Sequence, residues 1–210
     1  MIELELKYKI NEVPNAISKM APNKTKNQSD IYFDTKNYDL ISGGNFLRVR
    51  NNRSLDFKLG TVDTTHLYCK ESSFLISEFE ERFSDINNIF ESLGLAGCEF
   101  AESFAEFVKH NDFEILAPIE KTREEFKIDD DITISIDNVS NLGLFLEAEI
   151  MIDANELSKQ QAEVSRKKLE NKLNELGVFV SGAKEVNVGY VELYLIEHNK
   201  QAYEKGMFKI

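Results

Sequence analysis

Polar and apolar residues alternate one by one over several short stretches of this chain. In the stretch 2–10, Glu3, Glu5, Lys7 and Lys9 alternate with apolar residues. Because successive side chains of a β-strand point to opposite faces, each such stretch predicts a strand with one charged face and one apolar face. The strands predicted in this way span residues 2–10, 30–34, 46–50, 55–60, 66–71, 76–83, 119–128, 131–138 and 144–152.

Stretches with a helical spacing of apolar residues separate and follow these strands. The longest predicted helix spans residues 154–176 and ends at Gly177. Shorter helices are predicted at 12–20, 85–94, 101–110, 189–196 and 200–206. This order of elements predicts an α+β fold, in which helices gather outside a largely antiparallel sheet.

The charged faces of the strands have two explanations. An antiparallel sheet can leave one face in solvent, and a charged face then needs no further role. Alternatively, the strands close into a barrel with a polar interior and with helices over its apolar outer face. Burying ions without partners is very costly, so such an interior needs either a lattice of internal salt bridges or a charged ligand. We favour the barrel with a ligand, because the same pattern recurs on many segments.

The charges on these faces are of both signs. Arginine can bond two phosphate oxygens at once, and lysine adds a compact positive charge. Carboxylates at positions i and i+2 of a strand point together, and Mg²⁺ or Mn²⁺ prefers such oxygen ligands. Together they predict a site for a polyphosphate bridged to a divalent metal. The basic candidates are Lys7, Lys9, Arg48, Arg50, Lys58, Arg82, Lys121, Arg123 and Lys127, and the acidic candidates are Glu3, Glu5, Glu78, Glu80, Asp137, Glu147 and Glu149.

The chain as a whole is acidic, with a formal net charge of −12 over 210 residues. This charge argues against general binding to nucleic acids or anionic membranes, which requires a broad basic surface. Cys69 and Cys98 lack the spacing of a metal site, so we expect free thiols in a reducing compartment, the cytoplasm. No signal peptide, membrane span, nucleotide-binding glycine motif or catalytic serine elbow is evident.

Several motifs together resemble the CYTH superfamily, also called triphosphate tunnel metalloenzymes. Glu3-x-Glu5-x-Lys7 is similar to the ExExK motif that this family has near its N-terminus. The other matches are Asp30-Ile31-Tyr32-Phe33-Asp34-Thr35 to D-x-Y-[YF]-D-T, Leu47-Arg48-Val49-Arg50 to LRxR, Glu78-Phe79-Glu80 to ExE, Lys121-x-Arg123 to KxR, and Asp137 with Leu142-Gly143-x-Phe145-x-Glu147-x-Glu149 to D…LGxFxExE. The resemblance therefore covers essentially the whole chain.

The resemblance implies a single CYTH-like domain over residues 1–210, with a helical insertion near 85–115. Its fold would be a closed eight-stranded β-barrel, the triphosphate tunnel. From the resemblance we expect catalytic roles for Glu5, Lys58, Glu147 and Glu149, and metal binding by Glu3, Glu5, Asp137, Glu147 and Glu149. The expected phosphate-binding residues are Lys7, Lys9, Arg48, Arg50, Lys58, Arg82, Lys121 and Arg123.

The family includes thiamine triphosphatases, inorganic triphosphatases and class IV adenylate cyclases. The run from Tyr194 to Tyr203 and the insertion between Gly94 and Ile115 look more like thiamine triphosphatases. We therefore expect a Mg²⁺- or Mn²⁺-dependent triphosphatase for thiamine triphosphate or inorganic tripolyphosphate, active as a monomer or homodimer. The chain has no tryptophan, so a thiamine ring would stack on phenylalanine or tyrosine.

Two other functions stay open at this point. A class IV adenylate cyclase would convert ATP to cyclic AMP and pyrophosphate, and a non-catalytic module would bind polyphosphate or a nucleotide without turnover. Two strand registers also fit the stretch 55–71, so the sequence does not decide whether Lys58 or Lys70 faces the ligand. The sequence also does not decide whether Lys184 faces the ligand.

Overall fold

A computed structural model describes residues 2–60, 70–95, 98–152 and 158–208 of the chain. The chain divides into two compact units. The first is formed by the described residues of Met1–Gln28 and Glu120–Val188, and the second by those of Ser29–Thr64, Cys69–Ile119 and Gly189–Ile210. Each unit is built from strands and helices that the spacing of polar and apolar residues largely predicts.

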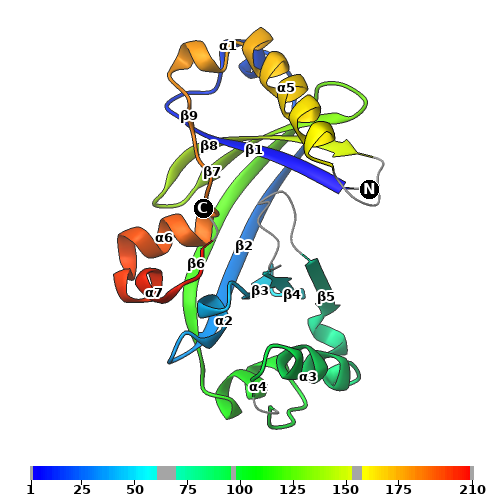
Figure 1. Cartoon of the computed structure of the whole chain (residues 1–210), viewed down its shortest axis with the longest axis vertical. Helices are drawn as coiled ribbons and strands as arrows, with labels where there is room; N and C mark the ends of the chain where they lie inside the picture. The colour runs from blue at the N-terminus through cyan, green and yellow to red at the C-terminus, as the bar shows by residue number, and fades with distance from the viewer. Residues whose placement is uncertain (1, 61–69, 96–97, 153–157, 209–210) are drawn as a thin grey trace. The chain divides into compact units, whose positions relative to one another are not determined.

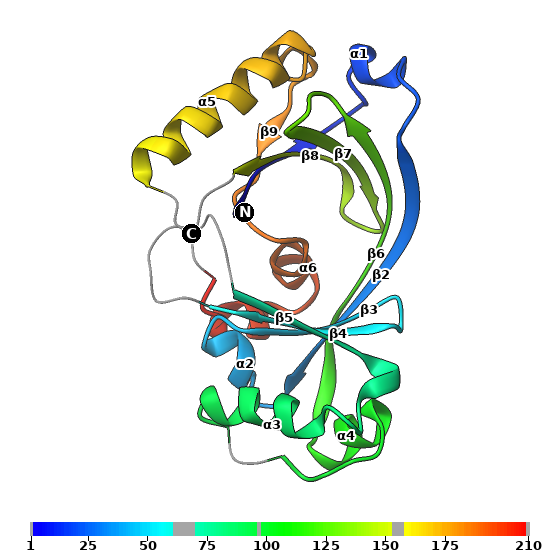
Figure 2. The same cartoon turned by 90° about the vertical axis from the view of Figure 1, so that its right-hand side faces the viewer.

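The elements follow one another along the chain as Figures 1 and 2 show. The strands are β1 (Ile2–Ile10), β2 (Lys24–Thr35), β3 (Phe46–Arg50), β4 (Ser54–Leu59), β5 (Lys70–Leu75), β6 (Phe113–Lys127), β7 (Ile132–Val139), β8 (Gly143–Ile152) and β9 (Lys184–Glu185). The helices are α1 (Asn15–Ser18), α2 (Asp39–Ser42), α3 (Phe83–Ser92), α4 (Phe104–His110), α5 (Lys159–Glu175), α6 (Tyr190–His198) and α7 (Lys200–Lys205), with short 3₁₀ helices η1 (Ile76–Glu78) and η2 (Phe179–Ser181).

The strand order is β5-β4-β3-β2-β6-β7-β8-β1-β9, and neighbouring strands pair antiparallel wherever their register is described. The predicted α+β class with a large antiparallel sheet is confirmed. In the part of the chain that the structure describes, the sheet has nine strands, whereas the family resemblance implied a barrel of eight. Within the described residues the order ends at β5 and β9, so closure into a barrel stays a prediction.

In the first unit, the apolar face of β1, β7 and β8 packs against α5 (Figure 1). Leu169 and Leu173 of α5 are fully buried there, and each buried leucine contributes about 2 kcal/mol to folding. Ser158 begins this helix with a capping box to Gln161. Because the helix covers the apolar face, the charged residues of these strands are left on the opposite face.

In the second unit, the apolar face of β3 and β4 packs against α3 and α4 (Figure 2). This core is mainly aromatic, with Phe57 and Phe90 ring centroids 5.2 Å apart in an edge-to-face arrangement. In β4, Lys58 pairs with Glu71 and Leu59 with Lys70. This register resolves the two alternatives, because it places Lys58 on the sheet face of Asp56, opposite to the aromatic core.

The strand predicted at 76–83 is wrong. Ile76–Glu78 forms η1 and Phe83 begins α3, so the charged residues of this stretch do not line a strand. Ile76, Phe79 and Phe83 recur every three to four residues, and this helical spacing continues through the buried Ile86 and Phe90 of α3. Glu78, Glu80 and Arg82 stand at every second position, and this spacing led to the incorrect prediction of a strand.

The remaining predicted elements are present with shifted ends. The first helix is shorter than the predicted 12–20, and β5 ends at Leu75, beyond the predicted end at residue 71. Residues 61–69, which include Cys69, lie outside the described part of the chain. Cys98 is a free cysteine, as predicted. None of the described helices is long and apolar enough to span a membrane.

Glu192 is an acidic residue among the otherwise apolar buried residues of α6. Glu192 is only 5% exposed, and its Oε1 atom has no hydrogen-bond partner among the described residues. Burial disfavours the carboxylate and raises the pKa of Glu192 to about 7. The folded protein therefore holds a proton on Glu192 at pH values at which the unfolded chain has lost it.

We predict that Glu192→Gln stabilises the protein at alkaline pH alone. The pKa of Glu192 is raised on folding, so the stability that its protonation confers is complete below about pH 4.5 and is lost as the pH rises to about 7. The variant should gain about 1–2 kcal/mol in the free energy of unfolding over wild type at pH 8 and almost nothing at pH 4.5. Denaturant titrations at both pH values measure this, and an equal difference at both would contradict it.

Candidate functional site

The charged cluster of the first unit lies on the face of β1, β6, β7 and β8 that α5 leaves uncovered. The strand register brings its members together, since Lys7 lies opposite Glu147 and Arg123 lies opposite Asp137. Glu5 lies opposite Glu149, two residues away from Lys7 on β1 and on the same face. The alternation of each strand places every second side chain on this face, so residues distant in sequence meet.

Glu147 pairs with cations from two other strands. Its carboxylate lies 3.2 Å from the ammonium group of Lys7 and pairs as well with the guanidinium of Arg123. Lys7 lies 3.2 Å from Glu5, and Arg123 lies 3.6 Å from Glu149. Two cations thus connect three carboxylates within the cluster.

Asp137 is fully buried beside this group. Its carboxylate accepts a hydrogen bond of 2.6 Å from Lys121 Nζ and bonds of 2.7 and 2.6 Å from Nε and Nη2 of Arg123. Burial alone would raise the pKa of Asp137, but Arg123 and Lys121 hold it below the usual value. Asp137 therefore orients both cations.

The same competition between burial and partners keeps the central charges in place. Burial alone would raise the pKa of Glu147, yet Lys7, Arg123 and Lys121 hold it below the usual value. Burial alone would lower the pKa of Lys7, yet Glu5 and Glu147 raise it. For Lys121 burial prevails and lowers the pKa, against the opposing effects of Glu147 and Asp137. Glu147 and Lys7 are therefore both charged at neutral pH.

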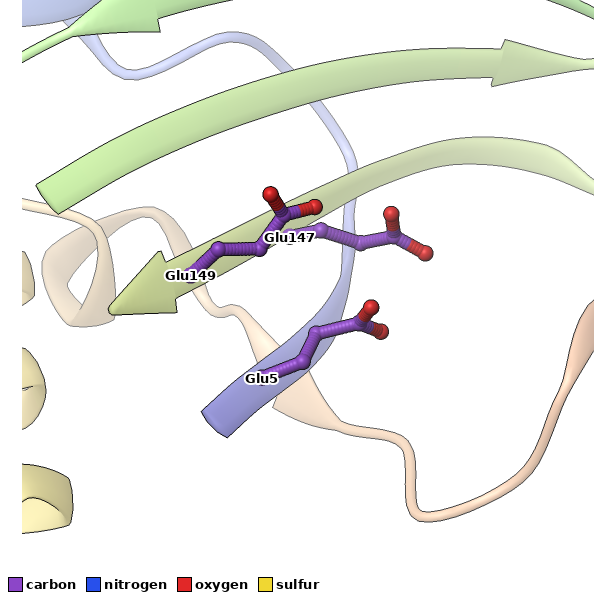
Figure 3. Close-up of side chains that lie close together, drawn as sticks. All are labelled: Glu5, Glu147 and Glu149. Carbon is purple, nitrogen blue, oxygen red and sulfur yellow. The ribbon is translucent and has the colours of Figure 1, made fainter. Parts of the chain in front are cut away.

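Three of the predicted metal ligands converge. Figure 3 shows Glu5 on β1 and Glu147 and Glu149 on β8, with their carboxylate groups close together. One oxygen from each lies within 4.8 Å of the others. Hard carboxylate oxygens at this spacing fit Mg²⁺ or Mn²⁺, which also keeps water molecules in its coordination shell. The donor set is therefore suitable for a divalent metal.

A second charged cluster lies in the second unit, on the face of β2, β3 and β4 opposite to the aromatic core. Arg50 donates two hydrogen bonds of 2.8 Å to Asp30, and Arg48 donates bonds of 3.1 and 2.8 Å to Asp56. Burial alone would lower the pKa of Arg48, but Tyr32, Asp30 and Asp56 raise it. Arg48 and Arg50, two of the predicted phosphate-binding residues, are thus fixed by carboxylates.

Other predicted site residues lie apart from the two clusters or at their margins. Lys9 is exposed, with Nζ 5.7 Å from the centre of the Phe145 ring. Lys58 is half-buried, and Lys127 is exposed beside Asp130. The side chain of Glu3 lies outside the described part of the chain.

Arg82 was predicted on a strand but precedes α3. It pairs with Asp85 at 2.8 Å and lies over the ring of Phe74, at 5.3 Å from its centre. Glu78 and Glu80 lie in or next to η1. These contacts join Arg82 to α3 and β5 of the second unit and to neither charged cluster.

The sequence alone suggested no partners for the arginines. Asp56 lies two residues before Lys58 on the same strand face, and Asp30 lies two before Tyr32, so the alternation that revealed the cations also marked these carboxylates. Ser135, opposite Glu147, was likewise left out of the predicted site. Its Oγ atom is buried and has no hydrogen-bond partner in the part of the chain that the structure describes.

Comparison with known proteins agrees with this fold. The model of the CYTH domain family matches residues 1–204, and the chain belongs to this family. It is 32% identical over 165 residues to a Methanocaldococcus jannaschii protein named “Putative adenylate cyclase MJ0240”. The match covers 76% of this chain and 83% of that protein.

Solved structures share the fold. The PH1819 protein of Pyrococcus horikoshii OT3 has a TM-score of 0.64 and 24% identity, with 93% of this chain and 99% of that one covered. A Hippeastrum structure described as “Putative adenylyl cyclase HpAC1 from Hippeastrum reveals a dominant triphophatase activity” has a TM-score of 0.54 and 19% identity. It covers 84% of this chain and 87% of its own.

We predict that Glu5→Gln and Glu149→Gln each weaken Mn²⁺ binding by about 10-fold or more, because each removes one charged oxygen donor. Calorimetric titration of Mn²⁺ into the full chain measures this. Glu163→Gln is the matched control, since Glu163 is exposed on α5 and undergoes the same chemical change. Equal Mn²⁺ affinities for all three variants and wild type would contradict the assignment.

Proposed function

We propose that this protein is a metal-dependent triphosphatase, which cleaves the terminal phosphoryl group from thiamine triphosphate or inorganic tripolyphosphate. The observation that carries the proposal is the meeting of Glu5, Glu147 and Glu149 with the cations Lys7 and Arg123 on one sheet face. Triphosphate is a dense anion that binds to both kinds of group, through the cations directly and through the carboxylates by way of a divalent metal.

The residues have separate roles in this proposal. Glu5, Glu147 and Glu149 would hold the metal, which when bound neutralises phosphate oxygens and lowers the pKa of water. Lys7 and Arg123 bind phosphate oxygens, and Asp137 fixes the orientation of Arg123. Phosphoryl transfer needs chiefly positioning and neutralisation of charge, which fixed cations supply. The proposal also keeps Lys9, Lys121, Arg48, Arg50 and Lys58 as phosphate-binding residues, as the family resemblance implies.

Aromatic side chains beside the arginines of the second unit favour an organic triphosphate. Phe46 shares its strand face with Arg48, and its ring centroid lies 6.3 Å from those of Tyr32 and Phe208. Phe208 in turn stacks on Tyr203 at 5.4 Å. Phe46 is only half-buried, so one ring of this group is accessible to a ligand. A thiazolium or pyrimidine ring stacks well on such a surface.

Adenylate cyclase is the second candidate, and the name of the Methanocaldococcus jannaschii relative supports it. Cyclisation would use the same cations and metal, but the ribose 3′-hydroxyl would attack the α-phosphorus and pyrophosphate would leave. It also requires a site that holds adenine in one orientation. Hydrolysis needs only water as the nucleophile, so the charged cluster of the first unit contains more of what hydrolysis requires.

An assay of reaction products distinguishes the candidates. Purified full chain with Mg²⁺ or Mn²⁺ would be given thiamine triphosphate, tripolyphosphate and ATP separately. We expect orthophosphate, with thiamine triphosphate as the best substrate. Cyclic AMP with pyrophosphate from ATP would instead identify a cyclase, and binding without any product would identify a non-catalytic module.

We predict that Phe46→Ala discriminates between substrates. Loss of ring stacking should raise KM for thiamine triphosphate about 10-fold, because base–aromatic stacking contributes about 1–3 kcal/mol. KM for tripolyphosphate, which has no ring, should change by less than about twofold. Phe100→Ala, at an exposed phenylalanine, is the control. Equal changes in KM for both substrates would refute the role of Phe46.

A further inference from the structure

Asp56 holds Arg48 through two hydrogen bonds to a single oxygen. The two residues face each other across β3 and β4, and Oδ2 of Asp56 accepts from Nε and Nη2 of Arg48 at 3.1 and 2.8 Å. Both residues are only 5% exposed. An ion pair this deeply buried is held more firmly than a surface pair, because water does not compete for either partner.

Ser73 extends this contact to a third strand. It lies opposite Asp56 on β5, and its hydroxyl donates a hydrogen bond of 2.6 Å to Oδ1, the carboxylate oxygen that Arg48 does not use. The carboxylate is therefore fixed at both oxygens. A fixed carboxylate in turn fixes the plane of the guanidinium, since the N–H groups of arginine form a rigid fork.

One nitrogen of the guanidinium, Nη1, is held less closely than the other two. Nη1 of Arg48 lies 3.6 Å from Oδ2 of Asp30, which is beyond hydrogen-bond length. Asp30 accepts two shorter bonds, of 2.8 Å each, from Arg50. The orientation of Arg48 is thus set from the Nε side while the N–H groups of Nη1 can bond a phosphate oxygen.

We propose that Asp56 and Ser73 are positioning residues, which hold Arg48 ready to bind a phosphate group of the substrate. The inference rests on the proposed function, in which Arg48 binds phosphate. An arginine that is already oriented loses little side-chain freedom on binding, so the ligand binds more tightly.

Positioning and simple electrostatics predict opposite changes in phosphate binding when Asp56 loses its charge. Removing the negative charge of Asp56 makes the surroundings of Arg48 more positive, which by itself would strengthen the binding of an anion. If Asp56 acts by positioning, its removal weakens that binding. A purely structural role would lower stability and leave the affinity of the folded protein unchanged.

The test measures tripolyphosphate binding and the KM and kcat of its hydrolysis for the full chain. We expect Asp56→Asn to raise the Kd and KM about 10-fold, and Ser73→Ala about threefold, with smaller changes in kcat. In an Arg48→Ala background, Asp56→Asn should add almost nothing, because the residue that it positions is gone. Asp131→Asn, which removes an exposed carboxylate of the first unit, is the control of equal charge.

Tighter or unchanged binding in Asp56→Asn, or additive effects in the double variant, would overturn the inference and leave the proposed function intact. Absence of both binding and hydrolysis in wild type would overturn the proposed function and this inference with it. If Asp56→Asn does not fold, Ser73→Ala decides, because it retains the ion pair: unchanged binding in that variant would refute the inference.

Discussion

The buried ion pairs of Glu147 are the interaction on which the candidate site depends. A carboxylate that is taken out of water costs several kcal/mol unless cations and hydrogen bonds surround it. Glu147 meets this requirement through Lys7 on the neighbouring strand and through Arg123 from β6. The strands β1, β6, β7 and β8 must therefore keep their register, because a slip by one residue would place these charges among the leucines and isoleucines of the opposite face.

The two units repeat one arrangement with different partners. In each, helices cover the apolar face of a sheet, and cations and carboxylates pair on the other face. In the first unit three carboxylates converge at a spacing that suits a divalent metal, whereas in the second unit the carboxylates are separated by arginines. Phosphate oxygens can replace carboxylates as partners of lysine and arginine without leaving the cations uncompensated. A lattice of paired charges is therefore compatible with binding a polyanion.

The alternation of polar and apolar residues predicted most of the strands and of their charged faces. A strand that is covered on one face only keeps apolar residues at every second position. The alternation located β1, β3, β7 and β8 closely, and it placed on one charged face Glu5, Lys7, Arg123, Glu147 and Glu149, which the structure brings together. It failed at 76–83, where charged residues alternate by chance over a helical spacing of phenylalanines.

The pairing of charges was not predictable in the same way. Alternation gives the face of a residue but not its neighbour on the next strand, so Asp56 and Ser73 were missed as partners of Arg48. Asp137 was predicted as a metal ligand, and the structure surrounds it with Lys121 and Arg123. Its role in metal binding stays a prediction.

The central claim is that the charged faces bind a triphosphate and do not merely neutralise themselves. Calorimetric titration of an imido-bridged tripolyphosphate, which resists hydrolysis, into wild-type protein with Mg²⁺ tests it directly. Saturable binding to one site, weakening as salt is raised, is the predicted result, since ion pairing is screened by salt. Absence of binding at low salt, with the protein folded and Mg²⁺ present, would show that the charges pair only with one another.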